Sequence, residues 1–396
     1  ESACSAAMMR ITGGGIRKHA MRALPYSYGT ASLIMKAKQL VEPGTVLYGW
    51  LLVSDNMPEG YRQAFKISRE LSDGKLESSA LARLLKVEGT VKDGHGTFHE
   101  NRVLKSDEVI DHARRSGNVS AEFCARILKQ DSCIALGRLR EAKRSAIEMT
   151  DIAKSLDRTS LASAQGQLAI IFALTGYWDD CRRAAKLCIE LSPKVNSILL
   201  CALDTLAVAE FQTGNWTRKE QHEDALLANG AGNPTHFFGT ISIPTICSII
   251  DDREYLDKAM DNLIWGEWQK FAADPDFIGF NVNTYRASVT MGVYIQKDRE
   301  KAQALIDVFK HQPGLIIGSL SFAASADRLM GLLLIVLDRL DEAIEHFDQA
   351  ITFAEQATIW PDFAWAHYEL AGTLCKRGDK GDWSRAKMVL QKGRTT

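Results

Sequence analysis

The sequence predicts an all-α fold, a right-handed α-solenoid of about nine degenerate helix hairpins with a period near 40 residues. Three observations support this prediction. A tight turn followed by an amphipathic segment recurs along the chain, and an apolar stretch of helical length precedes each turn. Ala, Leu, Glu, Lys and Arg are abundant, whereas alternating patterns and Asn-Gly-type turns are scarce, which disfavours a strand-rich fold.

The clearest unit covers residues 176–193 and reads GYWDDCRRAAKLCIELSP. Gly176 provides the turn, and two acidic residues follow at the predicted helix start, where they favour the helix dipole. Pro193 ends the helix. The apolar positions are spaced three and four apart, as one buried helix face requires: Cys181, Ala184, Ala185, Cys188 and Leu191.

Related turns recur at regular distances. Clear ones lie at Gly137, Gly176, Gly214, Lys297, Asp338 and Gly381, with looser versions near Gly96 and Asp252 and another unit from Glu59. Between 96 and 381 the successive intervals are 41, 39, 38, 38, 45, 41 and 43 residues. The apolar stretches 161–174 and 199–211 provide the helix before the turn. Two helices per period form a hairpin, and stacked hairpins bury one continuous core.

The unit at Gly176 resembles the tetratricopeptide repeat, with an aromatic residue two places after the turn at Trp178, small residues within the helix and a closing proline. The period is longer than the family's usual period of about 34 residues. Cys181 and Lys219 also stand where that family usually has alanine.

The last segment, residues 360–386, reads WPDFAWAHYELAGTLCKRGDKGDWSRA. It is similar to the final hairpins of carboxy-terminal arrays in bacterial STAND-type transcriptional activators and in class III nucleotide cyclases fused to ATPase-like modules. The resemblance implies a tetratricopeptide-like solenoid over residues 25–396, with residues 1–24 as a linker or partial cap.

Composition excludes several classes of protein. Hydrophobic residues form 46% of the chain and charged residues 24%, as in a core-forming protein, and the net charge is -1. We expect no direct nucleic-acid binding, because such proteins usually carry a basic surplus. The apolar runs are too short for a membrane span, and no secretion signal is present. The eight cysteines contain no CxxC pair, which favours reduced thiols and a cytoplasmic location.

No catalytic, cofactor-binding or metal site is expected. Gly13, Gly14 and Gly15 lack the spacing of a phosphate-binding loop, and His95, His99 and Glu100 form HGTFHE rather than the HExxH of zinc proteases. We therefore interpret the histidines as part of a polar turn. Cys181 and Cys188 are expected in the core, and the acidic cluster of Asp251, Asp252, Asp257 and Asp261 is expected on a solvated face.

An aromatic-rich segment between 265 and 286 carries the one candidate partner groove. Helical spacing favours a core role for its first three aromatic residues. The alternative is a groove for a partner or ligand, since aromatic residues are common anchors at interfaces. The candidate residues are Trp265, Trp268, Lys270, Phe271, Phe277, Phe280, Tyr285 and Arg286.

These features predict a non-catalytic protein-interaction or sensory scaffold, the regulatory array of a larger bacterial signalling protein. The expected partner is a protein or peptide, which includes the chain's own upstream domain. The chain begins at Glu1 without a methionine, as a fragment would. Two alternatives stay open. The chain is the regulatory half of an enzyme with a cyclase or ATPase domain upstream, or it is an array that senses a small molecule.

Overall fold

The computed structural model describes residues 28–55, 57–87, 94–192, 197–215, 256, 280–318 and 323–394. Residues 1–24, the acidic cluster at 251–261 and Lys219 lie outside the described residues, so the predictions made for them stay predictions.

The described chain is α-helical apart from one short strand pair. The helices before residue 216 are α3 (Tyr28–Leu40), α4 (Val46–Asp55), α5 (Pro58–Glu70), α6 (Gly74–Val87), α7 (His95–Arg115), α8 (Val119–Ala135), α9 (Leu139–Lys154), α10 (Arg158–Leu174), α11 (Trp178–Leu191) and α12 (Ser197–Gln212). Those after residue 279 are α18 (Phe280–Gln296), α19 (Arg299–Phe309), α20 (Ala326–Val336), α21 (Leu340–Ala357), α22 (Trp360–Arg377) and α23 (Asp382–Arg394).

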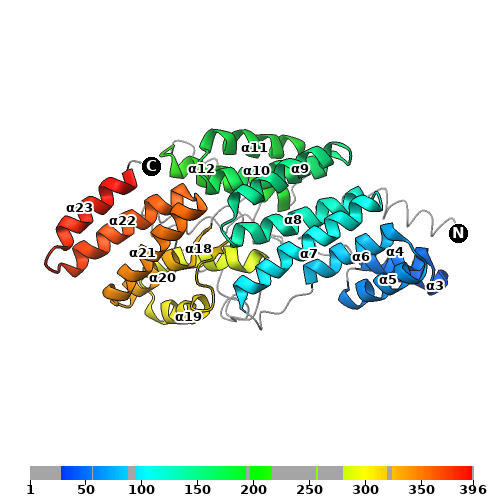
Figure 1. Cartoon of the computed structure of the whole chain (residues 1–396), viewed down its shortest axis with the longest axis horizontal. Helices are drawn as coiled ribbons and strands as arrows, with labels where there is room; N and C mark the ends of the chain where they lie inside the picture. The colour runs from blue at the N-terminus through cyan, green and yellow to red at the C-terminus, as the bar shows by residue number, and fades with distance from the viewer. Residues whose placement is uncertain are drawn as a thin grey trace.

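Consecutive helices pack against one another as hairpins, which confirms the all-α solenoid (Figure 1). We call the helix before each predicted turn the inner helix and the helix after it the outer helix. All six clear turn residues have a positive φ: Gly137, Gly176, Gly214, Lys297, Asp338 and Gly381. The left-handed conformation ends one helix and redirects the chain into the next. Between neighbouring turns that the structure describes, the interval predicted from the sequence is therefore a structural period.

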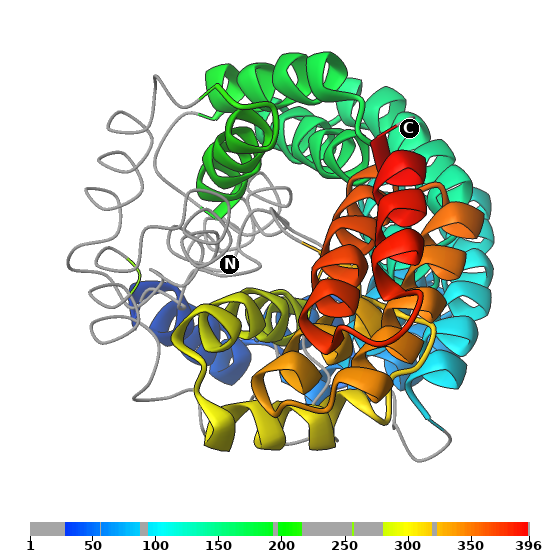
Figure 2. The same ribbon diagram turned by 90° about the vertical axis from the view of Figure 1, so that its left-hand side faces the viewer.

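The array curves back on itself. Seen from one end, the described helices follow a curved path (Figure 2). The path brings α22, drawn in orange-red, back to α10 and α12, drawn in green; α10 contacts α22, and a hydrogen bond joins α12 to α22.

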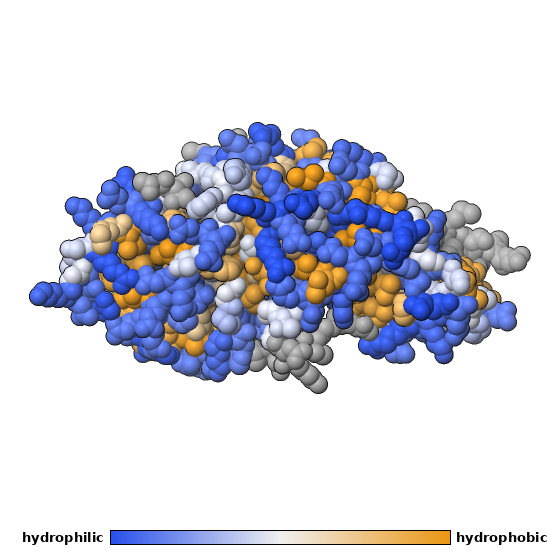
Figure 3. All heavy atoms as spheres, viewed as in Figure 1, coloured by the Kyte–Doolittle hydropathy of each residue, from blue (hydrophilic) through white to orange (hydrophobic). Residues whose placement is uncertain are grey.

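The outer surface is predominantly hydrophilic on the face shown in Figure 3, with hydrophobic residues gathered between the helices. In the described part of the chain, no helix has the length and apolar character that crossing a membrane requires.

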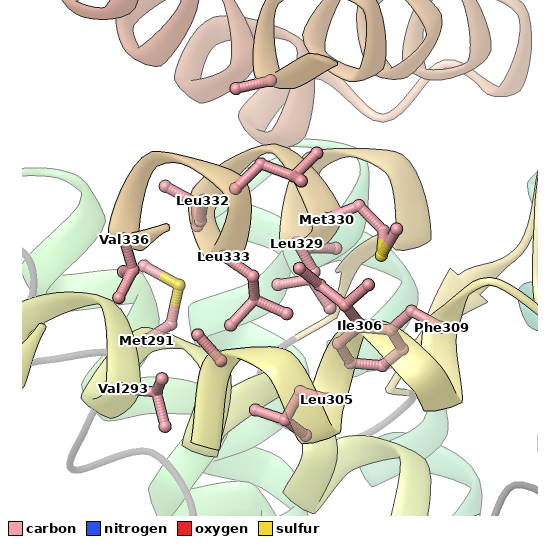
Figure 4. Close-up of a cluster of buried hydrophobic side chains, with 14 of the residues drawn as sticks. Met291, Val293, Leu305, Ile306, Phe309, Leu329, Met330, Leu332, Leu333 and Val336 are labelled. Carbon is pink, nitrogen blue, oxygen red and sulfur yellow. The ribbon is translucent and has the colours of Figure 1, made fainter. Parts of the chain in front are cut away.

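Close helix packing depends on small residues at a fixed position. Five residues after five of the six clear turn residues, the outer helix places a small side chain that is at most 3% exposed: Ala142, Cys181, Ala302, Ala343 and Ala386. Larger side chains fill the spaces between helices, as Met291, Leu305, Phe309 and Leu333 do between α18, α19 and α20 (Figure 4). Full burial of each such side chain stabilises the fold by roughly 1.5–3 kcal/mol.

Strands β1 (Ile316–Ile317) and β2 (Ala324–Ser325), which the sequence did not predict, pair antiparallel between α19 and α20. Ile316 lies opposite Ser325, and β1 also contacts α8. Ser325 then caps α20, because its hydroxyl accepts a hydrogen bond from the Arg328 amide at 3.3 Å. The strand pair therefore fixes the start of α20 against the middle of the array.

Candidate functional site

Two parts of the chain that are distant in sequence meet where α22 returns to α10 and α12. The indole Nε1 of Trp365 donates a hydrogen bond to Oε1 of Gln212 at 2.8 Å, across 153 residues of sequence. Helix α22 begins at Trp360 and Pro361, where a proline fits because the first helical amide needs no partner. We call this contact, together with the ionic group around Arg328 described next, the joint.

Arg328 is the ionic centre of the joint. Its guanidinium donates from Nε and Nη2 to the carboxylate of Glu369 at 2.8 and 2.7 Å, and from Nη1 to Oδ1 of Asp362 at 3.0 Å. The other Asp362 oxygen accepts the Ser325 amide at 2.9 Å. This two-pronged Arg–carboxylate geometry fixes direction as well as distance. The group therefore ties the start of α20 to the face of α22.

The electrostatics of this group make it sensitive to the loss of either partner. Burial alone would lower the pKa of Arg328, but Glu369 and Asp362 outweigh it and hold that pKa above its ordinary value. The guanidinium therefore stays charged, and it also lies 5.7 Å from the ring centroid of Trp365. Burial raises the pKa of Glu369 despite the facing arginine. Removing one charge would leave the others buried without compensation.

A narrow cleft at the joint has a volume of about 30 Å³, enough for a water molecule or two but not for a metabolite. Its walls include Leu174, Trp178 and Gln212 on one side and Arg328, Pro361 and Trp365 on the other.

Helices α21 and α22 pack closely against two turn glycines, Gly137 and Gly176. A Cβ added at Gly137 would lie 2.9 Å from the Phe353 ring and 3.0 Å from the Ala357 Cβ. At Gly176 the nearest atom would be Cδ of Pro361, at 3.6 Å. The bend between α21 and α22 thus sits directly on the turns that end α8 and α10.

The predicted partner groove lies mainly beyond what the structure describes. Trp265, Trp268, Lys270, Phe271 and Phe277 are outside the described residues, and Phe280 and Tyr285 lie on α18. Arg286, also on α18, is fully buried and donates to Oδ1 of Asn283 at 3.0 Å. The groove stays a prediction.

The polar turn predicted at His95, His99 and Glu100 is wrong, because these residues lie on α7. Both histidines are buried, and His99 Nδ1 lies 3.3 Å from the Ser132 hydroxyl on α8. Burial, reinforced by Arg102 and His95, lowers the pKa of His99 to about 3. Gly96 costs the helix only about 1 kcal/mol, which packing of α7 on α8 overcomes.

Two further predictions concern metals and thiols. Across the part of the chain that the structure describes, no three His, Cys, Asp or Glu side chains are grouped to hold a metal ion. Cys181 and Cys188 are fully buried, which confirms their core role. Burial raises the pKa of both thiols to about 12.

Sequence reasoning did not find Arg328, Asp362, Trp365 and Glu369. One signal was available. Arg328 directly precedes the apolar run from 329 to 337, and Asp362, Trp365 and Glu369 are spaced three and four apart, on one helix face. The pattern predicts a polar contact along this helix face but does not show which residues it contacts.

No protein-family model matches the chain, and no curated protein matches it. Among solved structures, the Cut9–Hcn1 hetero-tetramer of the APC/C matches 98% of this chain and 86% of that chain, with 10% identity and a TM-score of 0.34. A circular tandem repeat protein with a novel repeat topology matches 100% of this chain and 94% of that chain, with 14% identity and a TM-score of 0.21. Both superpositions are distant, so the fold assignment rests on the described helices and turns.

Proposed function

We propose that this chain is a non-catalytic protein-interaction array that regulates a signalling domain, either one that precedes it in a longer bacterial protein or one that it binds. The joint is the observation that supports this function. It links Gln212 on α12 to Trp365 on α22, so its opening would separate these two helices.

Regulation follows from a difference in affinity between two shapes. A protein partner that binds the closed array better than the open one shifts the population towards closure by that difference. The partner in turn binds less tightly when the joint is weakened, because coupling is reciprocal. A small-molecule effector has no comparable support at the joint, since the cleft there holds little more than water.

The test weakens the joint without removing a core side chain. Trp365→Phe keeps an aromatic ring but loses the donor to Gln212, and Gln212→Leu loses the acceptor. The full chain is used to capture partners, which are identified and purified, and their affinities for all three proteins are measured by calorimetry. Small-angle X-ray scattering reports whether the array has opened.

We expect partner affinity to change by about fivefold or more in both variants, in the same direction. Regulation through the joint would be refuted if scattering showed that the variants are open and the unaltered protein is closed, yet the partner bound all of them with equal affinity. The gene sequence upstream of Glu1 tests the signalling role. A nucleotide-binding or cyclase motif there supports it, and a start codon within a few residues supports a free-standing adaptor.

A further inference from the structure

The last described outer helix exposes apolar side chains at two positions where the apolar side chains of the other described outer helices are buried or half-buried. Nine residues after the turn residue, Ala146, Ala185, Ile306 and Phe347 are at most 6% exposed, whereas the equivalent Leu390 is 39% exposed. Two residues after the turn, Leu139 is buried and Trp178 and Leu340 are half-buried, whereas Trp383 is 70% exposed; Arg299, the polar residue at this position in α19, is exposed as well. Trp383 and Leu390 are seven residues apart and so lie on one face of α23, about two helical turns apart.

In the earlier hairpins, the next inner helix covers this face. Ala146 of α9 shares a hydrophobic cluster with Ala164 of α10, and Ala185 of α11 shares one with Leu206 of α12. Phe347 of α21 shares a third cluster with Leu370 of α22. Helix α23 packs on α22 and, through the Arg385–Asp348 ion pair, on α21; Figure 1 places it at one end of the described array. The repeat therefore indicates that an α-helix is the shape that fits this face of α23.

Charge at a third equivalent position, in one of the earlier hairpins, indicates its chemistry. Six residues after the turn, Arg182 of α11 pairs with Glu210 of the next inner helix, with Nε 3.1 Å from Oε1. The equivalent cation of α23 is Lys387, which is exposed. Asp382 is the only acidic residue within α23, and it is buried and paired with Arg377. The exposed side of α23 is therefore apolar and basic.

We propose that Trp383, Lys387 and Leu390, which we call the end face, dock an amphipathic α-helix of a partner protein. That helix would present a carboxylate beside its apolar stripe, in the place that the next inner helix takes in earlier hairpins. A second copy of this chain is the poorer occupant, because two end faces would bring like charges together. The inference rests on the proposed interaction function and names the surface and the partner's chemistry.

A peptide from the chain's own repeat provides the probe. Residues 197–213 contain α12, which covers the equivalent face of α11 and carries Glu210. A helix-stapled synthetic peptide of this sequence, with Cys201→Ser and a fluorescent label, is titrated with the full chain and followed by anisotropy. Met388→Ser is the matched control. Met388 is 65% exposed on the same helix, but it occupies a position that is also exposed at Arg144, Arg183 and Glu345.

We expect the unaltered protein and Met388→Ser to bind the peptide equally and Trp383→Ser to bind it at least about tenfold more weakly. Lys387→Glu should also weaken binding, and the peptide carrying Glu210→Lys should restore it. Because all three positions are solvent-exposed, circular dichroism of the variants should match that of the unaltered protein.

Three results would overturn the inference: no binding of the peptide to the unaltered protein, equal binding by Trp383→Ser and Met388→Ser, or a dimer that Trp383→Ser dissociates. The last would make a second copy the occupant. The proposed function fails separately, because its test uses a natural partner and changes at Trp365 and Gln212.

Discussion

Acid should weaken this fold through His99. The pKa of this side chain falls from 6.5 to about 3 in the folded protein, so between these values the unfolded chain binds more protons than the folded one. Stability is therefore fully present above pH 6.5 and is lost as the pH falls. At pH 5, one and a half units below the ordinary value, the expected loss is about 2 kcal/mol. This figure hardly depends on the folded pKa, provided that it lies well below 5.

His99→Gln tests this expectation, because glutamine keeps a polar side chain but cannot take up the proton. Urea unfolding at pH 7.5 and pH 5 gives the pH-dependent loss for each protein, and groups other than His99 cancel in the difference. We expect the unaltered protein to lose about 2 kcal/mol more than the variant. Ser132→Ala is the control: it removes the hydroxyl near Nδ1 but leaves the buried ring, so it should keep the acid sensitivity. Equal losses in the unaltered protein and His99→Gln would refute the reasoning.

Three further outcomes follow from buried groups and turns. Arg328→Met should lower the free energy of unfolding by about 3–5 kcal/mol in urea, because two carboxylates lose their cation, and adding Glu369→Met should recover part of that loss. Gly137→Ala should destabilise by roughly 1–3 kcal/mol more than Gly117→Ala, since both have a positive φ but only Gly137 has Phe353 within 3 Å; equal thermal shifts would contradict this. Alkylation followed by mass spectrometry should modify half-buried thiols such as Cys375 before the fully buried Cys133, Cys181 and Cys188, whose pKa values burial raises to about 12.

The hairpins could be predicted from the sequence because their determinants are local. A turn residue, a small residue five places later and an apolar helix before the turn all lie within one period, and Gly176 and Cys181 show the pattern directly. The prediction of a polar turn at His95 was wrong because its determinants are not local. Its glycine and polar neighbours indicate a turn, but packing against α8 makes the segment helical. Local propensity is a weak predictor where tertiary contacts decide.

The joint was not predicted because its two contacts differ in range. Arg328 meets Glu369 41 residues later, one period along and between consecutive inner helices, so stacking brings the helices together but does not name the residues that pair. Trp365 meets Gln212 153 residues earlier, and stacking of nearest neighbours does not predict that contact. The features that distinguish this chain from a regular repeat are therefore the places that depart from the pattern. The end face is one of them, because Trp383 and Leu390 follow the pattern in sequence but are exposed.

Gly137 shows how a residue can serve both the repeat and its closure. A positive φ does not by itself demand glycine here, since Lys297 and Asp338 adopt it at equivalent turns with φ of 57° and 60°. Gly137 differs from Lys297 and Asp338 in its surroundings. Because it has no Cβ, Phe353 and Ala357 can approach the turn closely. A side chain at this position would push α21 away from α8 and α9 while leaving the hairpin turn possible. The shape of the closed array is thus set at a turn whose local role other residues could perform.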